Sequence, residues 1–570
     1  MFKRKQKSSK AVAKDGPALD VALIGCGPAG MMFLHALNKS KEAGGSNLPN
    51  VTCYERAGSA GGIWRDVPDD DKERKKPENV PVMYDDLWTS TPKELMEFHD
   101  YTFNDHFKKD TPSFLPRKDI LEYLITRNSV DGALDDVKFN HTVRGVVYDE
   151  ESKKFSVTVR DDSTSEESTD EFDKVIYAGG IHNGAEKPAE LVELLREYTG
   201  KVLHSLECAE DFEQHVKDKR IMLIGDSGSG EDLALRAIKL GAEHVYIAAR
   251  QGEGEASETV SWPSEKVTVV YGPPYKVVKG TTFKCHAVYW SDKKQKFKRD
   301  DDEEPVKVKD IDTVVMCTGY DYTCVECLHD DLQLDDEETW SVTKGWKMEN
   351  NALTITLGSV KPSKELTTGS TCYPEIYRGV LIDNPSMFYI TETYDTASTF
   401  LDLDVNANLV LAYLTGKIEI PKEKDMIKAN QKQLEAEMQV PWLRTPMDGA
   451  YREEIAEIPD NHWSENADDE RAVALDRMAA SVLVKKLARD MKDVKYPLDL
   501  GDWKKLNALG EKLIDINIAA VKCRKCIPKE DSEWKTFRDM EQKEFVSLYT
   551  ENSSCALPGR WMDLDTSTFK

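Results

Sequence analysis

The sequence predicts an α/β protein built around two strand–turn–helix–strand units. Three observations predict this class. A glycine-rich turn joins a short apolar strand to a helix near residues 20–41, the same pattern returns near residues 220–240, and a second apolar strand follows each helix. Strands and helices that alternate in this way form parallel sheets with helices on their faces.

The first unit is predicted from three neighbouring segments. Residues 20–24 form a short apolar strand, residues 28–41 have helical apolar spacing, and residues 51–54 form a second strand. Residues 136–177 then alternate apolar and polar side chains, which is typical of a small antiparallel meander. Residues 172–178 return to a buried strand of the same unit.

The second unit repeats this order. We expect a strand at residues 221–224, a helix at 230–240 and a strand at 244–248. A highly charged stretch at 292–310 is expected to be a loop, and residues 312–316 a buried strand.

The composition disfavours several classes of partner. The chain has 77 basic and 103 acidic residues, a net charge of −26, which disfavours nucleic acid and anionic membrane surfaces. No apolar run reaches the roughly 20 residues that a membrane helix needs. The basic start of the chain lacks the apolar core of a secretion signal.

The 11 cysteines, an odd number, favour reduced thiols, and no metal site is predicted. We therefore expect a cytoplasmic protein.

The first glycine turn has the spacing of a dinucleotide-binding site. Gly25 permits the tight turn, Gly27 allows the backbone to approach a pyrophosphate, and Gly30 allows close packing of helix against strand. The free N–H groups at the helix N-terminus then face the phosphates. Pro28 and Ala29 complete the turn and are expected to line the same site.

The end of the next strand indicates which dinucleotide binds. Glu55 lies there, and its carboxylate can accept hydrogen bonds from an adenosine ribose but repels a 2′-phosphate. The first site therefore suits FAD or NAD. The residues expected to bind the same cofactor from this strand end and the loop after it are Glu55, Arg56, Gly62, Ile63 and Trp64.

The second glycine turn differs at the corresponding strand end. Arg250 occupies the place that Glu55 has in the first unit, and a guanidinium pairs well with a 2′-phosphate. This contrast assigns FAD to the first site and NADPH to the second. The turn residues expected to contact the second dinucleotide are Gly225, Ser227, Gly228 and Ser229.

Further segments carry a family resemblance. Three further segments occur at characteristic spacings from the two glycine turns. They are residues 87–98, the motif from Tyr198 through Gly200 and His204 to Cys208, and residues 317–320. With these segments the chain resembles the flavin-containing monooxygenases, which are class B flavoprotein monooxygenases, and within them the bacterial trimethylamine monooxygenase type. The likeness runs from about residue 20 to 420. A lone histidine is more often structural, and we expect this of His204.

The chain departs from the family pattern at three positions. Tyr198 replaces phenylalanine, Cys208 replaces an aromatic residue, and Ser90 replaces the asparagine of the active-site segment. In the family this asparagine amide lies beside the flavin. A serine is shorter and has one donor, so we expect more release of peroxide without oxygenation.

The resemblance implies a reaction and its residues. NADPH reduces FAD, O2 forms a C4a-hydroperoxyflavin, and a tertiary amine such as trimethylamine, or a sulfide, takes one oxygen atom. It also implies a homodimer. The residues that the resemblance places at the reaction centre are Ser90, Lys93 and Asp404, and those that it adds to the cofactor sites are Thr89, Thr318, Gly319, Tyr320 and Asn406.

The predicted fold is an FAD domain interrupted by a smaller NADPH domain, both Rossmann-like, with a helical extension. Three other functions stay open: an uncoupled NADPH oxidase, a Baeyer–Villiger oxygenase, and a nucleotide-binding regulatory protein without turnover. The predicted segments are a disordered basic tail (1–16), the FAD domain in two parts (17–205 and 311–420), the NADPH domain (206–310) and the extension (421–570).

Overall fold

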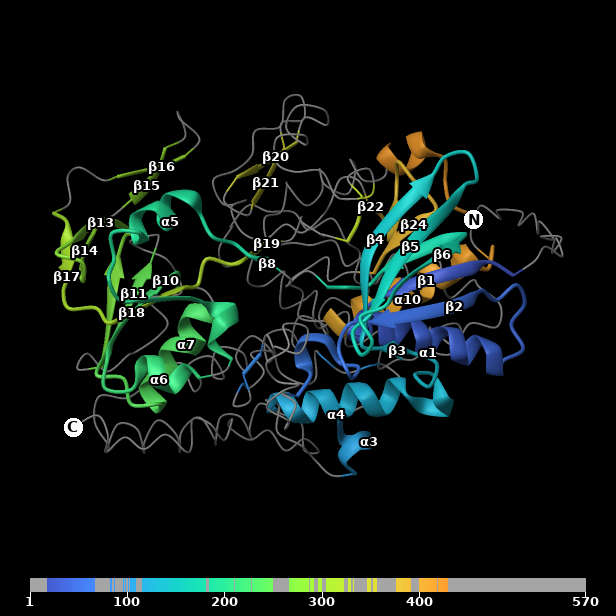
Figure 1. Cartoon of the computed structure of the whole chain (residues 1–570), viewed down its shortest axis with the longest axis horizontal. Coiled ribbons are helices and arrows are strands. Elements are labelled where there is room, and N and C mark those ends of the chain that lie inside the picture. Colours follow the sequence, from blue (N-terminus) through green and yellow to red (C-terminus); the bar gives the residue numbers. More distant parts are fainter. Residues whose placement is uncertain are drawn as a thin grey trace, which may run out of the picture.

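The structure is a computed structural model of the chain, and it contains two α/β units (Figure 1). The residues that it describes are 18–66, 83–84, 87, 96, 98, 101, 103–108, 115–180, 184–209, 211–226, 228–249, 266–286, 288–291, 296–299, 304–321, 327–329, 332, 346–349, 352–355, 376–390, 399–417 and 419–428. The predicted tail and most of the predicted extension lie outside these residues.

The first unit is organised by a seven-stranded sheet with the order β22-β23-β24-β7-β1-β2-β3. Its five strands from β24 to β3 pair in parallel, whereas β22 and β23 are antiparallel. The strands of this sheet are β1 (Asp20–Ile24), β2 (Asn50–Glu55), β3 (Lys138–Phe139), β7 (Lys174–Tyr177), β22 (Ile376–Tyr377), β23 (Val380–Leu381) and β24 (Met387–Tyr389).

Both faces of this sheet are covered, which explains its apolar strands. Because side chains alternate along a strand, Val21 and Leu23 of β1 pack among the helices, whereas Ala22 and Ile24 pack against the antiparallel meander. The helices of the first unit are α1 (Pro28–Glu42), α3 (Phe103–Phe107), α4 (Arg117–Asn128) and α10 (Thr399–Leu414), with short 3₁₀ turns η1 (Gly62–Trp64) and η4 (Val130–Gly132). The meander consists of β4 (His141–Asp149), β5 (Lys154–Asp161) and β6 (Glu167–Phe172).

The second unit contains a five-stranded parallel sheet with the order β12-β11-β10-β18-β9. Its strands are β9 (Lys201–His204), β10 (Arg220–Ile224), β11 (His244–Ala249), β12 (Val267–Tyr271) and β18 (Thr313–Met316). Its helices are α5 (Ala189–Leu195), α6 (Phe212–Val216) and α7 (Gly228–Lys239), with the 3₁₀ turn η5 (Ser205–Cys208). Further strands are β13 (Pro274–Val278), β14 (Thr282–Cys285), β15 (Val288–Ser291), β16 (Lys296–Arg299) and β17 (Val306–Val308).

The sheet pairing corrects two predicted domain boundaries. The predictions ended the first part of the FAD domain at residue 205 and resumed that domain at residue 311. However, β9 and β18 both pair inside the second sheet, β18 next to β10 and β9 next to β18. The second unit therefore begins before β9 and ends after β18. The charged stretch 292–310 is not all loop, because it contains β16 and β17.

The chain passes between the two units through a pair of short strands. β8 (Gly184–Ala185) leads into the second unit and β19 (Tyr320–Asp321) leads out of it, and the two pair antiparallel. The Thr318 hydroxyl donates to the Glu186 carbonyl at 2.5 Å, and the Glu186 N–H donates to the Gly319 carbonyl at 3.2 Å. In Figure 1 this pair lies between the two units. Elsewhere, β20 (Trp346–Glu349) and β21 (Ala352–Ile355) form a separate hairpin.

The strands and helices predicted for both glycine-turn units are confirmed. Most of their predicted ends lie within two residues of the observed ends. Each predicted strand, turn and helix occurs in the expected order, and β10 to β11 pair in parallel as β1 and β2 do. Among the described residues no helix combines the length and apolarity needed to cross a membrane.

Candidate functional site: two dinucleotide cradles

The first glycine turn joins β1 to α1 and allows only glycine at two positions. Gly25 has φ of +98°, and a Cβ there would lie 2.7 Å from the Ala178 carbonyl oxygen. A Cβ on Gly30 would lie 2.1 Å from the Gly25 carbonyl oxygen. Contacts this short involve backbone and cannot be relieved by a rotamer change. The turn therefore holds the N-terminus of the 15-residue helix α1 tightly against the strand ends, where its free N–H groups suit a pyrophosphate.

The predicted flavin loop lies against this turn. A Cβ on Gly62 would lie 2.9 Å from the Gly27 Cα, so the two loops approach each other backbone to backbone. The Gly61 N–H donates to the Cys26 carbonyl at 3.0 Å and fixes the contact. The structure thus brings together the two predicted segments around Gly27 and Gly62. The Trp64 side chain contacts Phe400 of α10, with ring centroids 6.0 Å apart.

The Glu55 carboxylate lies over the turn at the end of β2 and is buried. One of its oxygens accepts the Cys26 N–H at 2.7 Å and the other accepts the Ala57 N–H at 2.9 Å. Each carboxylate oxygen can accept a second hydrogen bond, so this arrangement leaves acceptor capacity for ribose hydroxyls. The residues present therefore fit the adenosine diphosphate part of a dinucleotide.

Two arginines that no sequence motif identifies lie near this cradle. Burial lowers the pKa of Arg65, and the nearby Glu55 carboxylate opposes that shift, so a cation lies close to the cradle. The Arg117 side chain donates to the Trp64 carbonyl and, at 2.8 Å, to the Arg65 carbonyl, and pairs with Asp66. Arg117 therefore clamps the end of the flavin loop to α4. Arg117 belongs to no motif, so no local signal could have identified it.

The second glycine turn has the same geometry as the first. Gly225 has φ of +112°, and its Cβ would lie 2.3 Å from the Cys317 carbonyl oxygen. A Cβ on Gly230 would lie 2.1 Å from the Gly225 carbonyl oxygen, the same distance as for Gly30 and Gly25. The 12-residue helix α7 begins at Gly228 in this turn. The second turn therefore also fits a pyrophosphate.

Predicted residues from two segments meet beside the second turn. Burial raises the pKa of Tyr320, and a hydrogen bond between its hydroxyl and the Ser229 side chain opposes that shift. Ser229 belongs to the turn and Tyr320 to β19. The strand that leaves the second unit is therefore attached to the turn that is expected to bind NADPH.

His204 is completely buried at the start of η5. Its ring Nδ1 accepts the Leu206 N–H at 3.2 Å, while the His204 backbone N–H donates to the Glu207 carboxylate at 2.6 Å, and the two bonds form a capping box. Burial and the nearby Lys187 lower the pKa of His204, against a hydrogen bond with the Gly319 backbone. These contacts agree with the structural role expected for His204. A Cβ on Gly200 would lie 2.1 Å from the Tyr198 hydroxyl oxygen, so Gly200 packs directly against Tyr198 of the same motif.

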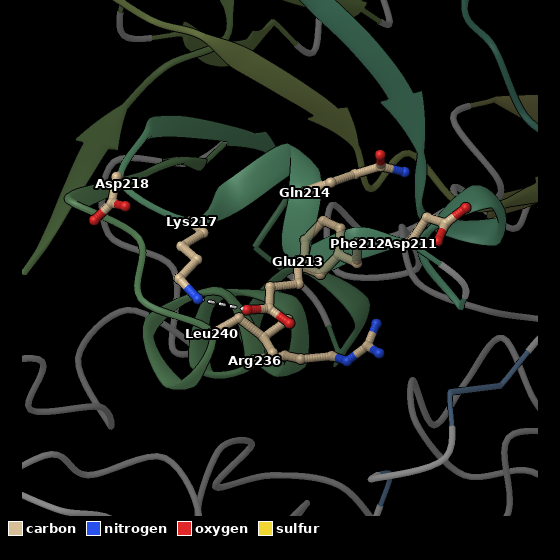
Figure 2. Close-up of a pocket in the computed structure, with 8 residues that line it drawn as sticks. All are labelled: Asp211, Phe212, Glu213, Gln214, Lys217, Asp218, Arg236 and Leu240. Atoms are coloured by element: carbon tan, nitrogen blue, oxygen red, sulfur yellow. Dashed lines mark hydrogen bonds and ion pairs between the residues drawn. The ribbon is translucent and has the colours of Figure 1, made fainter.

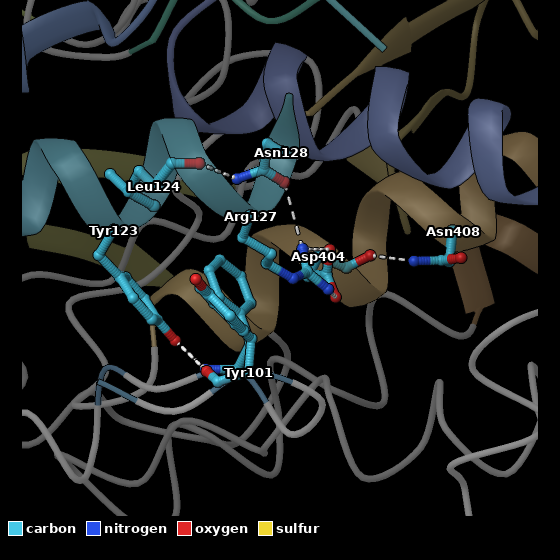
Figure 3. A network of polar contacts seen from close by, with 8 residues as sticks. Tyr101, Tyr123, Leu124, Arg127, Asn128, Asp404 and Asn408 are labelled. Carbon is cyan, nitrogen blue, oxygen red and sulfur yellow. Dashed lines mark hydrogen bonds and ion pairs between the residues drawn. The ribbon is translucent and has the colours of Figure 1, made fainter. Parts of the chain in front are cut away.

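Asp404 forms a buried ion pair in the first unit (Figure 3). Its two oxygens lie 2.9 and 3.0 Å from the Arg127 guanidinium nitrogens, and its carbonyl accepts the Asn408 amide at 2.8 Å. The guanidinium carbon lies 3.8 Å from the centroid of Phe98. These contacts join α4 to α10, and a catalytic role for Asp404 stays a prediction. Asn406 is buried on the same helix with its Oδ1 facing Gly379.

Several predicted residues cannot be placed. Those that lie outside the described residues are Thr89, Ser90, Lys93, Ser227 and Arg250. Their roles at the reaction centre and the second dinucleotide stay predictions. The described part of β11 ends at the buried Ala249, one position before Arg250.

A hollow of about 700 Å³ lies at another part of the second unit (Figure 2). Residues of α6, α7 and the connections around them line it, and they include charges of both signs. None of them belongs to a glycine turn. The lining residues are Asp211, Phe212, Glu213, Gln214, Lys217, Asp218, Arg236 and Leu240.

Comparison with known proteins agrees with this geometry. The model of the flavin-binding monooxygenase-like family matches residues 18–284, which include both glycine turns. The trimethylamine monooxygenase of Roseovarius nubinhibens is 28% identical over 421 residues, covering 72% of this chain and 78% of that protein. The chain is thus similar to the flavin-containing monooxygenases over the region that carries both glycine turns. Its enzyme class, a flavin monooxygenase, and its flavin cofactor follow from this relationship.

Other flavin-containing monooxygenases match a shorter region. Flavin-containing monooxygenase 5 of Rattus norvegicus is 28% identical over 237 residues, covering 41% of this chain and 40% of that protein. Among solved structures, that of Tmm from a Pelagibacter strain has a TM-score of 0.58 at 23% identity, covering 88% of this chain and 91% of that chain. The structure of S-allyl-L-cysteine S-oxygenase from Allium sativum has a TM-score of 0.55 at 19% identity, covering 92% and 99%. These two likenesses support the fold.

Proposed function

We propose that the chain is an FAD- and NADPH-dependent monooxygenase that transfers one oxygen atom of O2 to a soft nucleophile. The substrate class is a tertiary amine such as trimethylamine, or a sulfide. The observation that carries the proposal is the pair of matched glycine cradles, each with a Cβ position 2.1 Å from a backbone oxygen, in a homologue of trimethylamine monooxygenases. Two dinucleotide sites are what an enzyme needs to reduce a flavin with a nicotinamide.

The chain's own residues supply binding and orientation. In the first cradle, the α1 N-terminus and the Glu55 carboxylate would hold the diphosphate and ribose of FAD. The chemistry that bound FAD would supply is the reaction of the reduced flavin with O2. In the second cradle, the α7 N-terminus and Arg250 would hold NADPH, and the Ser229–Tyr320 contact would fix this turn relative to the strand that returns to the first unit.

One observation favours a second candidate, an NADPH oxidase that releases peroxide. Ser90 stands where the family has an asparagine beside the flavin. A hydroxyl offers fewer hydrogen bonds than a carboxamide, so it protects the reacting oxygen less well from water and protons. The ratio of peroxide to oxygenated product separates the two candidates.

The test is a coupled assay on the purified full chain. The oxygenase proposal expects a yellow protein that oxidises NADPH and forms N-oxide from trimethylamine or sulfoxide from dimethyl sulfide. Peroxide equal to the NADPH consumed, with no oxygenated product, would support the oxidase instead. A colourless protein that does not take up FAD would contradict both candidates.

The assignment of NADPH depends on Arg250. Arg250→Ala should raise the KM for NADPH by tenfold or more, about the worth of one charge-assisted contact, and leave the KM for NADH nearly unchanged. The matched control is Arg250→Lys, which keeps the charge. Its KM for NADPH should lie between those of the wild type and Arg250→Ala. Equal changes for NADPH and NADH would remove the role proposed for Arg250.

A further inference from the structure

Arg236 of α7 connects the second unit to a segment of the first. Its guanidinium donates to the Cys208 carbonyl and, at 3.4 Å, to the Ala209 carbonyl, both within the second unit. Its carbon lies 5.4 Å from the Phe212 ring centroid and 4.5 Å from the ring centroid of Tyr84. Figure 2 shows Arg236 and Phe212 at the edge of the hollow. The guanidinium is thus held by its own unit while it stacks on a buried tyrosine of the other.

Tyr84 is linked in turn to the flavin loop. The Leu87 N–H donates to the Tyr84 carbonyl at 3.2 Å, and the Leu87 carbonyl accepts the Arg117 N–H at 2.8 Å. The Arg117 side chain then donates to the carbonyls of Trp64 and Arg65, at the end of that loop. A continuous series of contacts therefore runs from α7 through Tyr84 and Leu87 to the loop that lies against the first glycine turn.

We propose that Arg236 is a positioning residue that couples the second dinucleotide unit to the flavin loop through Tyr84. The segment from Tyr84 to Leu87 leads into Ser90, three positions further along the chain. A shift of the second unit would therefore be transmitted to the flavin loop. This inference rests on the proposed function, because its consequence is the placement of the nicotinamide relative to the flavin.

The chemistry of the contact requires arginine and an aromatic ring. A planar guanidinium can stack on Tyr84 and Phe212 while its edge donates to the Cys208 and Ala209 carbonyls. A lysine ammonium is a single point charge and cannot make both sets of contacts. The face of the Tyr84 ring attracts the guanidinium, so a phenylalanine at this position should preserve the contact.

The first measurement is the rate at which NADPH reduces the bound flavin, followed by stopped flow. Arg236→Ala and Tyr84→Leu should each slow reduction by about tenfold, because a misplacement far from the reacting atoms is costly. Their combination should be no slower than the worse single variant. Tyr84→Phe should keep the normal rate, Arg236→Lys should be slow, and the dissociation constant of NADPH should not change. Unchanged rates, or fully additive effects, would overturn the inference.

The second measurement, hydrogen exchange of the Trp64 and Arg65 backbone amides, needs no NADPH. Both amides donate within the loop, to the Gly61 and Gly62 carbonyls. Arg236→Ala should speed their exchange. Lys217→Ala is the matched control, because Lys217 lines the same hollow and its ammonium pairs with Glu213 of the same unit, not with the first unit, among the described residues. Equal exchange in all variants would refute the coupling. A wild-type protein that NADPH fails to reduce would refute the proposed function, while the exchange result would still decide the coupling.

Discussion

At the scale of single residues, the two cradles depend on glycines whose missing Cβ leaves room for backbone. Gly30 and Gly230 have ordinary backbone angles, so strain in φ is not the reason for glycine at either position. The reason is the 2.1 Å between each Cβ position and a carbonyl oxygen of the same turn. Only a displacement of helix from strand could accommodate a methyl group there, and this displacement would open the pyrophosphate site.

Substituting these two glycines should separate the two sites. Gly30→Ala should yield protein that retains little or no flavin, as measured by absorbance of the bound cofactor. Gly230→Ala should retain flavin but lose its reduction by NADPH. Gly58→Ala is the control, because its Cβ would meet only the Asn140 side-chain oxygen at 3.4 Å. Flavin retained normally by Gly30→Ala would contradict the assignment of the first cradle.

The sequence predicts these glycines because their spacing is local, and it predicts Glu55 because a strand end can be located from its apolar run. It does not predict Arg65, Arg117 or Ala178 as parts of the same cradle. Ala178 faces Gly25 only because β7 pairs with β1, and Arg117 reaches the flavin loop only because α4 packs there. Contacts between segments far apart in the chain have no local pattern.

At the scale of elements, the cap of η5 should make stability depend on pH. The folded pKa of His204 lies below its ordinary value of 6.5, mainly because burial disfavours the charged ring. The folded state then binds fewer protons than the unfolded state. The stability that neutral His204 provides is complete above pH 6.5 and is lost as the pH falls from 6.5 toward the lowered folded value.

His204→Asn should remove this dependence, because an amide oxygen can still accept the Leu206 N–H but does not titrate in this range. The melting temperature of the wild type should fall more steeply between pH 7 and 5.5 than that of the variant. Parallel slopes would show that His204 does not carry the acid sensitivity. A lower melting temperature at every pH would reflect only the altered packing.

The ion pair between α4 and α10 is a second feature at this scale. Asp404→Asn should destabilise the first unit by about 3–5 kcal/mol, because it leaves the buried Arg127 guanidinium without its carboxylate. Urea unfolding would measure this loss. The double variant Arg127→Met with Asp404→Leu should recover much of it, since it removes both charges. An Asp404→Asn protein of normal stability that has lost turnover would instead support the catalytic role predicted from the resemblance.

At the scale of the whole molecule, the sequence predicts two units of one kind but misplaces the boundary between them. The predicted boundary at residue 205 puts β9 in the first unit. Its sheet partner is β18, more than a hundred positions later, and nothing in the residues of β9 indicates that pairing. The glycine turns mark the centre of each unit, whereas its edges are set by strand pairing over long separations.

The pairing of β8 with β19 has a consequence for how such a chain can be rearranged. Since the entry and exit strands run side by side, the intervening stretch starts and finishes at nearly one point in space. A stretch whose two ends lie close together can be deleted or exchanged as one unit. It can be excised and its neighbours rejoined by a short tether, or exchanged for the corresponding stretch of a relative, without altering the path of the remaining chain. An exchanged stretch would carry the second glycine turn with it, while the first glycine turn stays in the remaining chain.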